Sequence, residues 1–120
     1  MDRTVFLIAA LAGFIGVALG AFGAHGLRGR LSPEMLTVFE TGVRYQMYHA
    51  LALFATGLLM TRVAGRLIQA AAWLFVAGIV LFSGSLYTLA LTGRSIAGAI
   101  TPLGGLAFLV GWACLAIAAL

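Results

Sequence analysis

Charged residues are scarce in this sequence, and lysine is absent. The 120 residues include seven arginines and three acidic residues, so only 8% of the chain is charged. Soluble domains carry charge on about a quarter of their residues. So few charged side chains cannot cover the surface of a soluble domain of this size. This scarcity excludes an ordinary soluble enzyme and a disordered chain.

Cysteine is nearly absent, and the arginines are scattered. The one cysteine, Cys114, cannot form a disulfide within the chain and therefore says nothing about the redox compartment. The net charge of +4 comes from dispersed arginines rather than from a basic patch. A nucleic-acid-binding domain needs such a patch, so we expect no nucleic-acid partner.

Long apolar stretches are what the sequence does have, since 63% of the residues are hydrophobic. The arginines divide the chain into four such stretches, and about 20 apolar residues suffice for a helix to cross the hydrocarbon layer. A transmembrane barrel would alternate apolar and polar residues, which these stretches do not. We predict an all-α integral membrane four-helix bundle, a single domain over 1–120, with spans at about 4–24, 43–61, 67–92 and 96–119.

The first span has an alternative interpretation as a signal peptide. Arg3 precedes it, and the small residues Ala-Phe-Gly-Ala precede His25. Its apolar core is longer than the roughly 7–15 residues usual for a signal peptide. We therefore predict a retained transmembrane helix.

A helix start is visible before the second span. Ser32 can cap the helix, Pro33 suits its first position, and Glu34 lies near the positive end of the helix dipole. Apolar residues then recur at helical spacing, which predicts an amphipathic interfacial segment at about 33–42. Joined to the second span it would exceed the hydrocarbon thickness, so we expect a bend at Gly42.

The last two spans are separated by Gly93, a C-cap glycine, and Ser95, an expected N-cap. Within the fourth span, Thr101-Pro102 allows two alternatives. The helix is either kinked at Pro102 or begins there with Thr101 as its cap, and we favour the kink.

Small residues form a stripe on the first span. At helical spacing they share one face, where they allow close packing against another helix of the same chain or of a second copy. The predicted packing residues are Gly13, Gly16, Gly20 and Gly23.

Polar residues inside a membrane are costly and so mark candidate sites. Interfacial anchoring explains Arg44, Tyr45 and Tyr48, but explains the deeper His49 less well. We expect a hydrogen-bonded network between helices, with a ligand site or a proton path as alternatives. The candidate cluster is His25, Glu40, Arg44, Tyr45, Gln46, Tyr48, His49, Ser83, Ser85, Tyr87, Thr101 and Pro102.

Signals of catalysis, metal binding and cofactor binding are missing. The sequence contains no nucleophile–base arrangement, phosphate-binding loop or haem motif. The histidines and glutamates do not have metal-ligand spacing. We predict that the protein is not an enzyme and has no metal ligands and no cofactor.

Four motifs are distinctive: 18–25, 41–49, 81–87 and 101–105 with the later Gly111-Trp112. They resemble the DUF423 family of small bacterial inner-membrane proteins, related to the transmembrane protein 256 group. The resemblance covers essentially the whole chain and implies four transmembrane helices in the bacterial cytoplasmic membrane, with no established molecular function. Arginines are balanced between the two sides, so charge does not orient the chain. Some relatives carry a basic tail after the fourth helix, which would place both termini in the cytoplasm. This sequence has no such tail, but the resemblance favours the same orientation.

Three functional hypotheses follow. The first is a non-catalytic structural or accessory protein, surrounded by the lipid bilayer, that oligomerises or docks on a larger complex. The second is an oligomeric channel or transporter-like protein for a small solute, ion or proton, using His25, Glu40, Arg44 and His49. The third is lipid or quinone binding along the amphipathic segment 31–44.

Overall fold

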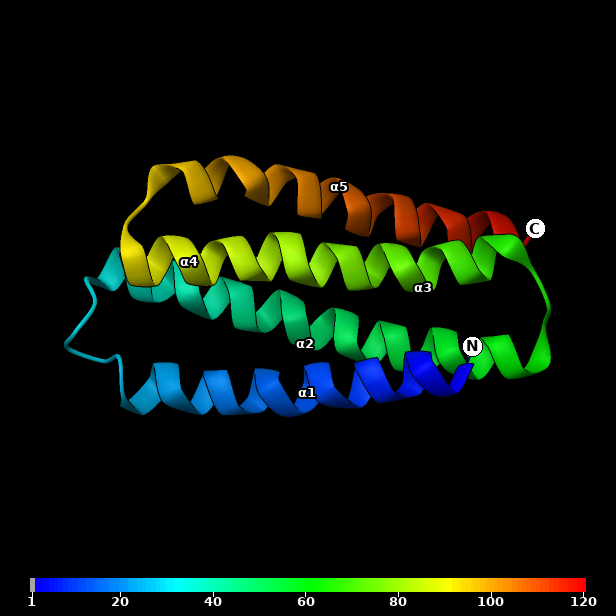
Figure 1. Cartoon of the computed structure of the whole chain (residues 1–120), viewed down its shortest axis with the longest axis horizontal. Coiled ribbons are helices and arrows are strands. Elements are labelled where there is room, and N and C mark those ends of the chain that lie inside the picture. Colours follow the sequence, from blue (N-terminus) through cyan, green and yellow to red (C-terminus); the bar gives the residue numbers. More distant parts are fainter. Residues whose placement is uncertain (1) are drawn as a thin grey trace.

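Four helical rods run antiparallel to one another in the computed structural model, which describes residues 2–120 (Figure 1). The third rod is continuous but contains a π-helical segment. The rods are α1 (Asp2–His25), α2 (Pro33–Arg62), α3–η1–α4 (Arg66–Gly78, Ile79–Ser83, Gly84–Thr92) and α5 (Ser95–Ala118).

The rods pack in the order of the chain. α1 contacts α2, α2 contacts the third rod, and the third rod contacts α5. Both termini and the α2–α3 connection lie at one end, while the α1–α2 and α4–α5 connections lie at the other (Figure 1). The molecule measures 48 × 25 × 19 Å, so its length is set by helices about as long as a membrane is thick.

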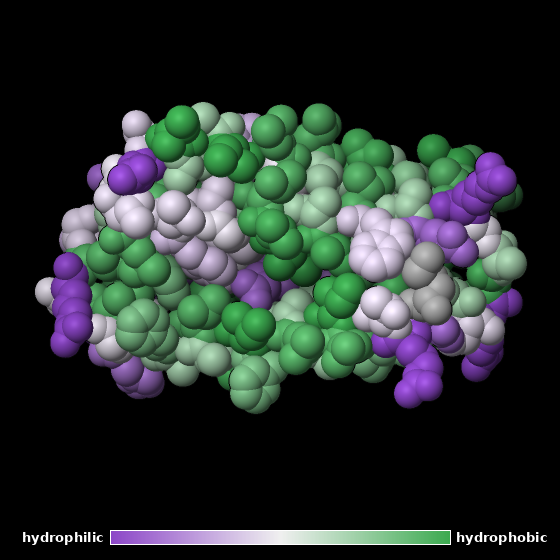
Figure 2. Space-filling view, in the orientation of Figure 1, coloured by the Kyte–Doolittle hydropathy of each residue, from purple (hydrophilic) through white to green (hydrophobic). Residues whose placement is uncertain are grey.

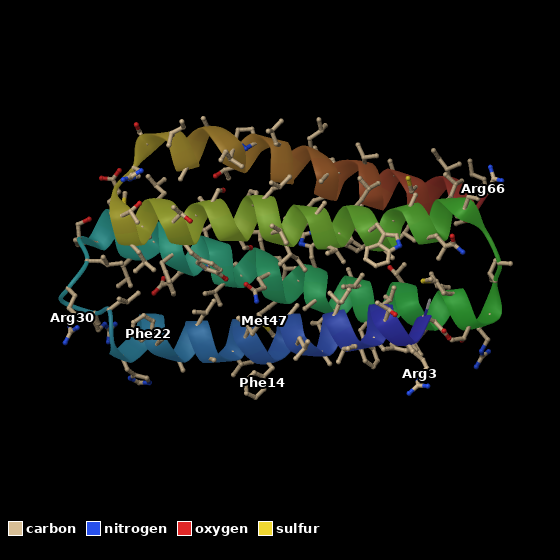
Figure 3. All side chains as sticks on the ribbon, in the orientation of Figure 1. Arg3, Phe14, Phe22, Arg30, Met47 and Arg66 are labelled. Atoms are coloured by element: carbon tan, nitrogen blue, oxygen red, sulfur yellow. The ribbon has the colours of Figure 1, made fainter. Side chains whose placement is uncertain are left out.

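The surface has the polarity of a membrane protein. Figure 2 shows hydrophilic residues gathered at the two ends and a mainly hydrophobic belt between them. Arg30 lies at one end and Arg3 and Arg66 at the other (Figure 3). Phe14 points outward from α1 within the belt and is 75% exposed. The protein is therefore an all-α integral membrane four-helix bundle, as the sequence predicts.

Within residues 2–120, three helical segments are long and apolar enough to cross a membrane: Asp2–His25, Arg66–Thr92 and Ser95–Ala118. α2 is not among them, although its 30 residues extend over about 45 Å. Polar residues such as Gln46 and His49 lower its hydropathy. α2 nevertheless lies beside α1 and the third rod along its length (Figure 1).

α2 begins at the predicted residue, but it is one helix rather than the two predicted segments. The Ser32 hydroxyl accepts a hydrogen bond from the backbone N–H of Met35 at 3.1 Å, which confirms the cap. The predicted interfacial segment 33–42 and the predicted span 43–61 then form one uninterrupted helix. Gly42 is buried inside it, where a side chain would collide with Tyr87. Close packing therefore explains this glycine.

The third and fourth spans differ in detail from the sequence expectation. The third contains the π-helical segment, which apolar periodicity did not indicate. Gly93 ends α4 with a φ of 72°, which confirms the C-cap. Ser95 is the first helical residue rather than the cap, and no side chain caps this helix. α5 continues through Pro102, so the alternative of a helix that begins there is wrong.

The glycine stripe of α1 faces α2 of the same chain. A Cβ at Gly16 would overlap the side chain of Met47, which points toward α1 in Figure 3. At Gly20 and Gly23 it would meet Val43 at 3.3 Å and Phe39 at 2.9 Å. At Gly13 it would meet nothing within 4 Å, so Gly13 takes no part in this contact.

A second glycine contact joins α5 to the third rod. A Cβ at Gly104 would collide with the backbone nitrogen of Phe82 in the π-helical segment. Phe108 packs directly against Gly78, and Phe75 packs against Gly111. α5 can therefore approach the third rod to backbone contact.

We expect Gly104→Ala to destabilise the protein and Gly105→Ala to leave it unchanged. The Cβ at position 104 would push against backbone, whereas the Cβ at 105 would lie 3.8 Å from the Phe82 ring. Overpacking of this kind costs about 1–3 kcal/mol. Thermal melting of the two variants in detergent, followed by size-exclusion chromatography, measures the difference. Equal melting temperatures would contradict the close contact.

Candidate functional site

His49 lies near the middle of α2 and is 5% exposed. Its Nδ1 is 2.8 Å from the carbonyl oxygen of Tyr45, one turn earlier. Its Nε2 is 3.1 Å from the indole nitrogen of Trp112 on α5. One imidazole thus connects the backbone of α2 to a side chain of α5.

These two partners determine the protonation of the ring. A carbonyl oxygen only accepts and an indole N–H only donates, so His49 Nδ1 carries the proton and Nε2 accepts. The imidazole is neutral, and both of its nitrogens are occupied. A second proton on Nε2 would break the bond from Trp112.

Aromatic rings surround the imidazole. The ring of Phe108 is stacked on it, with centroids 3.5 Å apart and planes 8° apart. Phe75 lies 5.5 Å away and Trp112 lies 6.0 Å away, both at steep angles. These rings come from α3 and α5, so they hold His49 of α2 against both helices.

A groove of about 580 Å³ opens beside this histidine. α2 forms one wall, α5 forms the other, and Phe82 of the π-helical segment lies between them. Its lining is mainly apolar and aromatic: Tyr45, His49, Phe82, Pro102, Gly105, Leu106, Phe108, Leu109 and Trp112. Pockets of 300–1,000 Å³ with an apolar lining and few polar groups are typical of small-molecule sites.

Gln46 makes a separate polar link, three residues before His49. Its side-chain amide donates to the carbonyl oxygen of Ala12 on α1 at 2.8 Å. Its side-chain oxygen accepts from the hydroxyl of Tyr87 on α4 at 2.6 Å. Gln46 is 4% exposed and joins three rods through one amide.

Hydroxyl groups of Ser83, Ser85 and Thr101 form hydrogen bonds around the π-helical segment. Ser83 donates to the carbonyl oxygen of Gly42 at 2.6 Å. Ser85 donates to the carbonyl oxygen of Phe82, so the 2.6 Å contact between Ser85 and Thr101 requires Thr101 to donate. Within residues 2–120, no fully buried side-chain nitrogen or oxygen lacks a hydrogen-bond partner.

The structure divides the candidate cluster in two. Its inner part forms the three sets of contacts above: Tyr45 with His49, Gln46 with Tyr87, and Ser83 and Ser85 with Gly42 and Thr101. Pro102 lines the groove. The outer part, His25, Glu40, Arg44 and Tyr48, is exposed and takes no part in these hydrogen bonds. In the described residues, no three His, Cys, Asp or Glu side chains lie together as a possible metal site.

Sequence reasoning missed the residues of α5 and α3 that complete the site. Trp112 donates to His49, and Phe108 and Phe75 pack on its ring. One available signal was the indole N–H of Trp112, because a tryptophan inside an apolar span needs an acceptor. No comparable signal indicates which phenylalanines face the imidazole.

The fold and the polar interior define a small polytopic membrane protein, and comparison with known proteins gives its family. Residues 19–105 match the family model described as protein of unknown function (DUF423). The chain is 49% identical to the UPF0382 membrane protein YwdK of Bacillus subtilis, over 98% of this chain and 96% of that protein. It is 47% identical to UPF0382 membrane protein SERP0230 of Staphylococcus epidermidis, with the same coverage. The chain belongs to the DUF423 family.

These relatives carry no assigned molecular function in their names, and they agree with the membrane location of the fold. UPF0382 membrane protein SH2409 of Staphylococcus haemolyticus is a third, 48% identical over 96% of this chain and 93% of that protein. No solved structure matches the chain.

We expect the hydrogen bond between Gln46 and Tyr87 to show coupling in a double-mutant cycle of Gln46→Leu and Tyr87→Phe. Each single change leaves one buried partner unpaired, whereas the double change removes both. Interhelical hydrogen bonds in membranes average about 0.6 kcal/mol and reach about 1.7 kcal/mol. Unfolding in mixed micelles measures the four stabilities. Additive effects would show that this bond contributes no net stability.

Proposed function

We propose that this protein is a non-catalytic, accessory membrane protein that binds a lipid-phase ligand in the groove between α2 and α5. The proposal rests on this groove, which has a volume of about 580 Å³, aromatic walls and a single hydrogen-bonded histidine. Its walls belong to two rods of a bundle whose flanks are apolar, so a ligand can enter from the bilayer rather than from water.

The state of His49 supports a binding role over a chemical one. A general base or a proton carrier needs a nitrogen free to take a proton. Both ring nitrogens of His49 are occupied by Tyr45 and Trp112. The imidazole therefore serves to position Trp112 and the aromatic wall.

The alternatives have less support. A proton or ion path using His25, Glu40, Arg44 and His49 needs these groups in one passage, but the first three are exposed. Oligomerisation through the glycine stripe needs a free face, but Gly16, Gly20 and Gly23 face α2 of the same chain. Ligand binding along 31–44 is weakened because Phe39 is fully buried. The groove, by contrast, is open.

We expect Gly105→Leu to reduce the lipophilic ligand retained by the purified protein. Gly105 lines the groove, and a leucine side chain there would occupy part of it. Gly13→Leu is the matched control, because a side chain at Gly13 projects into open space on α1. Both variants are extracted into polymer nanodiscs, and the retained small molecules are compared by mass spectrometry.

The expected result is a loss of specific retained molecules from Gly105→Leu and a wild-type pattern from Gly13→Leu. Melting temperatures close to wild type for both variants verify that each is folded. Identical patterns from all three proteins would overturn the proposed function.

We also propose a location in the bacterial cytoplasmic membrane with both termini in the cytoplasm. Arg3, Arg62 and Arg66 lie at or near the helix ends on the side of the termini, and Arg28, Arg30 and Arg94 lie in or next to the connections at the opposite end (Figures 1 and 3). Arginine in short loops and near the ends of transmembrane helices orients membrane proteins. The arginines are balanced, so the choice of cytoplasmic termini rests on the resemblance to family members with a basic C-terminal tail, and the balance makes the orientation easy to change.

We expect a C-terminal green fluorescent protein fusion to fluoresce and a C-terminal alkaline phosphatase fusion to be inactive. Replacing Arg62 and Arg66 by alanine should invert a substantial fraction of the molecules, because it removes positive charge from the cytoplasmic end. Replacing Arg28 and Arg30 is the control and should preserve the wild-type pattern. Active phosphatase on the unmodified chain would contradict this orientation.

A further inference from the structure

The lining of the groove restricts the kind of ligand that it can hold. This inference rests on the proposed function and goes further by naming the ligand class. No Arg, Lys, Asp or Glu is among the lining residues. His49, which is neutral, lies about 24 Å from the start of α2 and about 20 Å from its end. A charged lipid headgroup would lose its hydration there without a counter-charge, so the bound group is neutral.

The shape and chemistry of the lining favour a flat ring. Tyr45, Phe82, Phe108 and Trp112 supply aromatic surface from α2, η1 and α5. The Tyr45 ring lies 4.8 Å from Phe82, and Phe82 lies 5.5 Å from Phe108, which makes a continuous aromatic wall. A flat aromatic or quinone ring can pack on such a wall by offset or edge contacts. These contacts stabilise binding by more than the burial of apolar area alone.

The hydrogen-bonding groups favour a ligand that brings an acceptor. Both nitrogens of His49 are occupied, so the imidazole offers nothing further. The ring of Tyr45 contacts the rings of Tyr48, His49 and Phe82. Its hydroxyl forms no hydrogen bond within the described residues, so it can donate one to a ligand. A carbonyl oxygen on the ligand would accept this bond.

We propose that the groove binds the ring of a prenylated quinone, with its two carbonyl oxygens, and that the prenyl tail leaves toward the bilayer. Leu106 and Leu109 line the groove and are 58% and 69% exposed, which gives the tail an apolar exit along α5. A benzoquinone or naphthoquinone ring is planar and neutral and is smaller than the 580 Å³ groove. The ring meets each condition: no charge, flat faces and acceptor oxygens.

The two tryptophans of the chain make a direct test possible. Trp112 lines the groove, whereas Trp73 on α3 is 40% exposed and lies outside it. Trp73→Phe leaves Trp112 as the only indole, and Trp112→Phe leaves Trp73. Quinones quench indole fluorescence at short range. Both variants are reconstituted in nanodiscs and titrated with a prenylated naphthoquinone and a prenylated benzoquinone.

The expected result is saturable quenching of Trp112 by at least one of the two quinones and only linear, partition-driven quenching of Trp73. Adding Gly105→Leu to the Trp73→Phe variant should remove the saturable component. Adding Tyr45→Phe should weaken it about fivefold, the effect of losing one hydrogen bond. The unchanged linear quenching of Trp73 reports the concentration of quinone in the bilayer.

Linear quenching of both tryptophans by both quinones would overturn the quinone proposal. In that case the mass-spectrometric comparison of Gly105→Leu with Gly13→Leu still decides the proposed function. Retained acyl lipids that are lost only from Gly105→Leu would mean that the groove holds a lipid chain. No difference in either experiment would overturn both proposals.

Discussion

The constraint on which this structure depends is that polar groups inside a bilayer must find their partners within the protein. α2 carries the buried side chains of Gln46 and His49, which are 4% and 5% exposed. Gln46 is satisfied by Ala12 and Tyr87, and His49 by Tyr45 and Trp112. Ala12, Tyr87 and Trp112 belong to the three other rods, so these hydrogen bonds tie α2 to each of them. The polar side chains of α2 thus link it by hydrogen bonds to all three other rods.

Close packing of small residues and aromatic rings is the second interaction that holds the rods together. Apolar surface gives helices little reason to associate in lipid, so contact between small residues and rings must supply the attraction. Gly104 lies against the backbone of Phe82 in the π-helical segment, and the Ser85 hydroxyl donates to the carbonyl oxygen of Phe82. The backbone of α5 therefore packs on the third rod, and α5 reaches α2 through the side chains of Phe108 and Trp112. The groove lies beside His49 between these side chains of α2 and α5.

Much of the fold could be predicted because it depends on local features. Apolar length predicts the four rods, and the cap at Ser32 and the C-cap at Gly93 follow from side-chain and backbone preferences of single residues. The site was only partly predictable. Gln46, His49 and Tyr87 were candidates because polar residues in apolar stretches stand out, but Glu40 and Arg44 stood out equally and lie on the exposed side of α2.

The sequence by itself determined that the chain is helical, resides in a membrane and has a polar helix among apolar ones, because these properties depend on composition and helical spacing. Only the tertiary structure decided that Trp112 donates to His49, that α2 is one uninterrupted helix and that a π-helical turn faces Gly104. Trp112 and His49 are far apart in sequence, and several phenylalanines of similar hydrophobicity could occupy the place of Phe108. Such pairings depend on how whole helices pack, which no local pattern specifies.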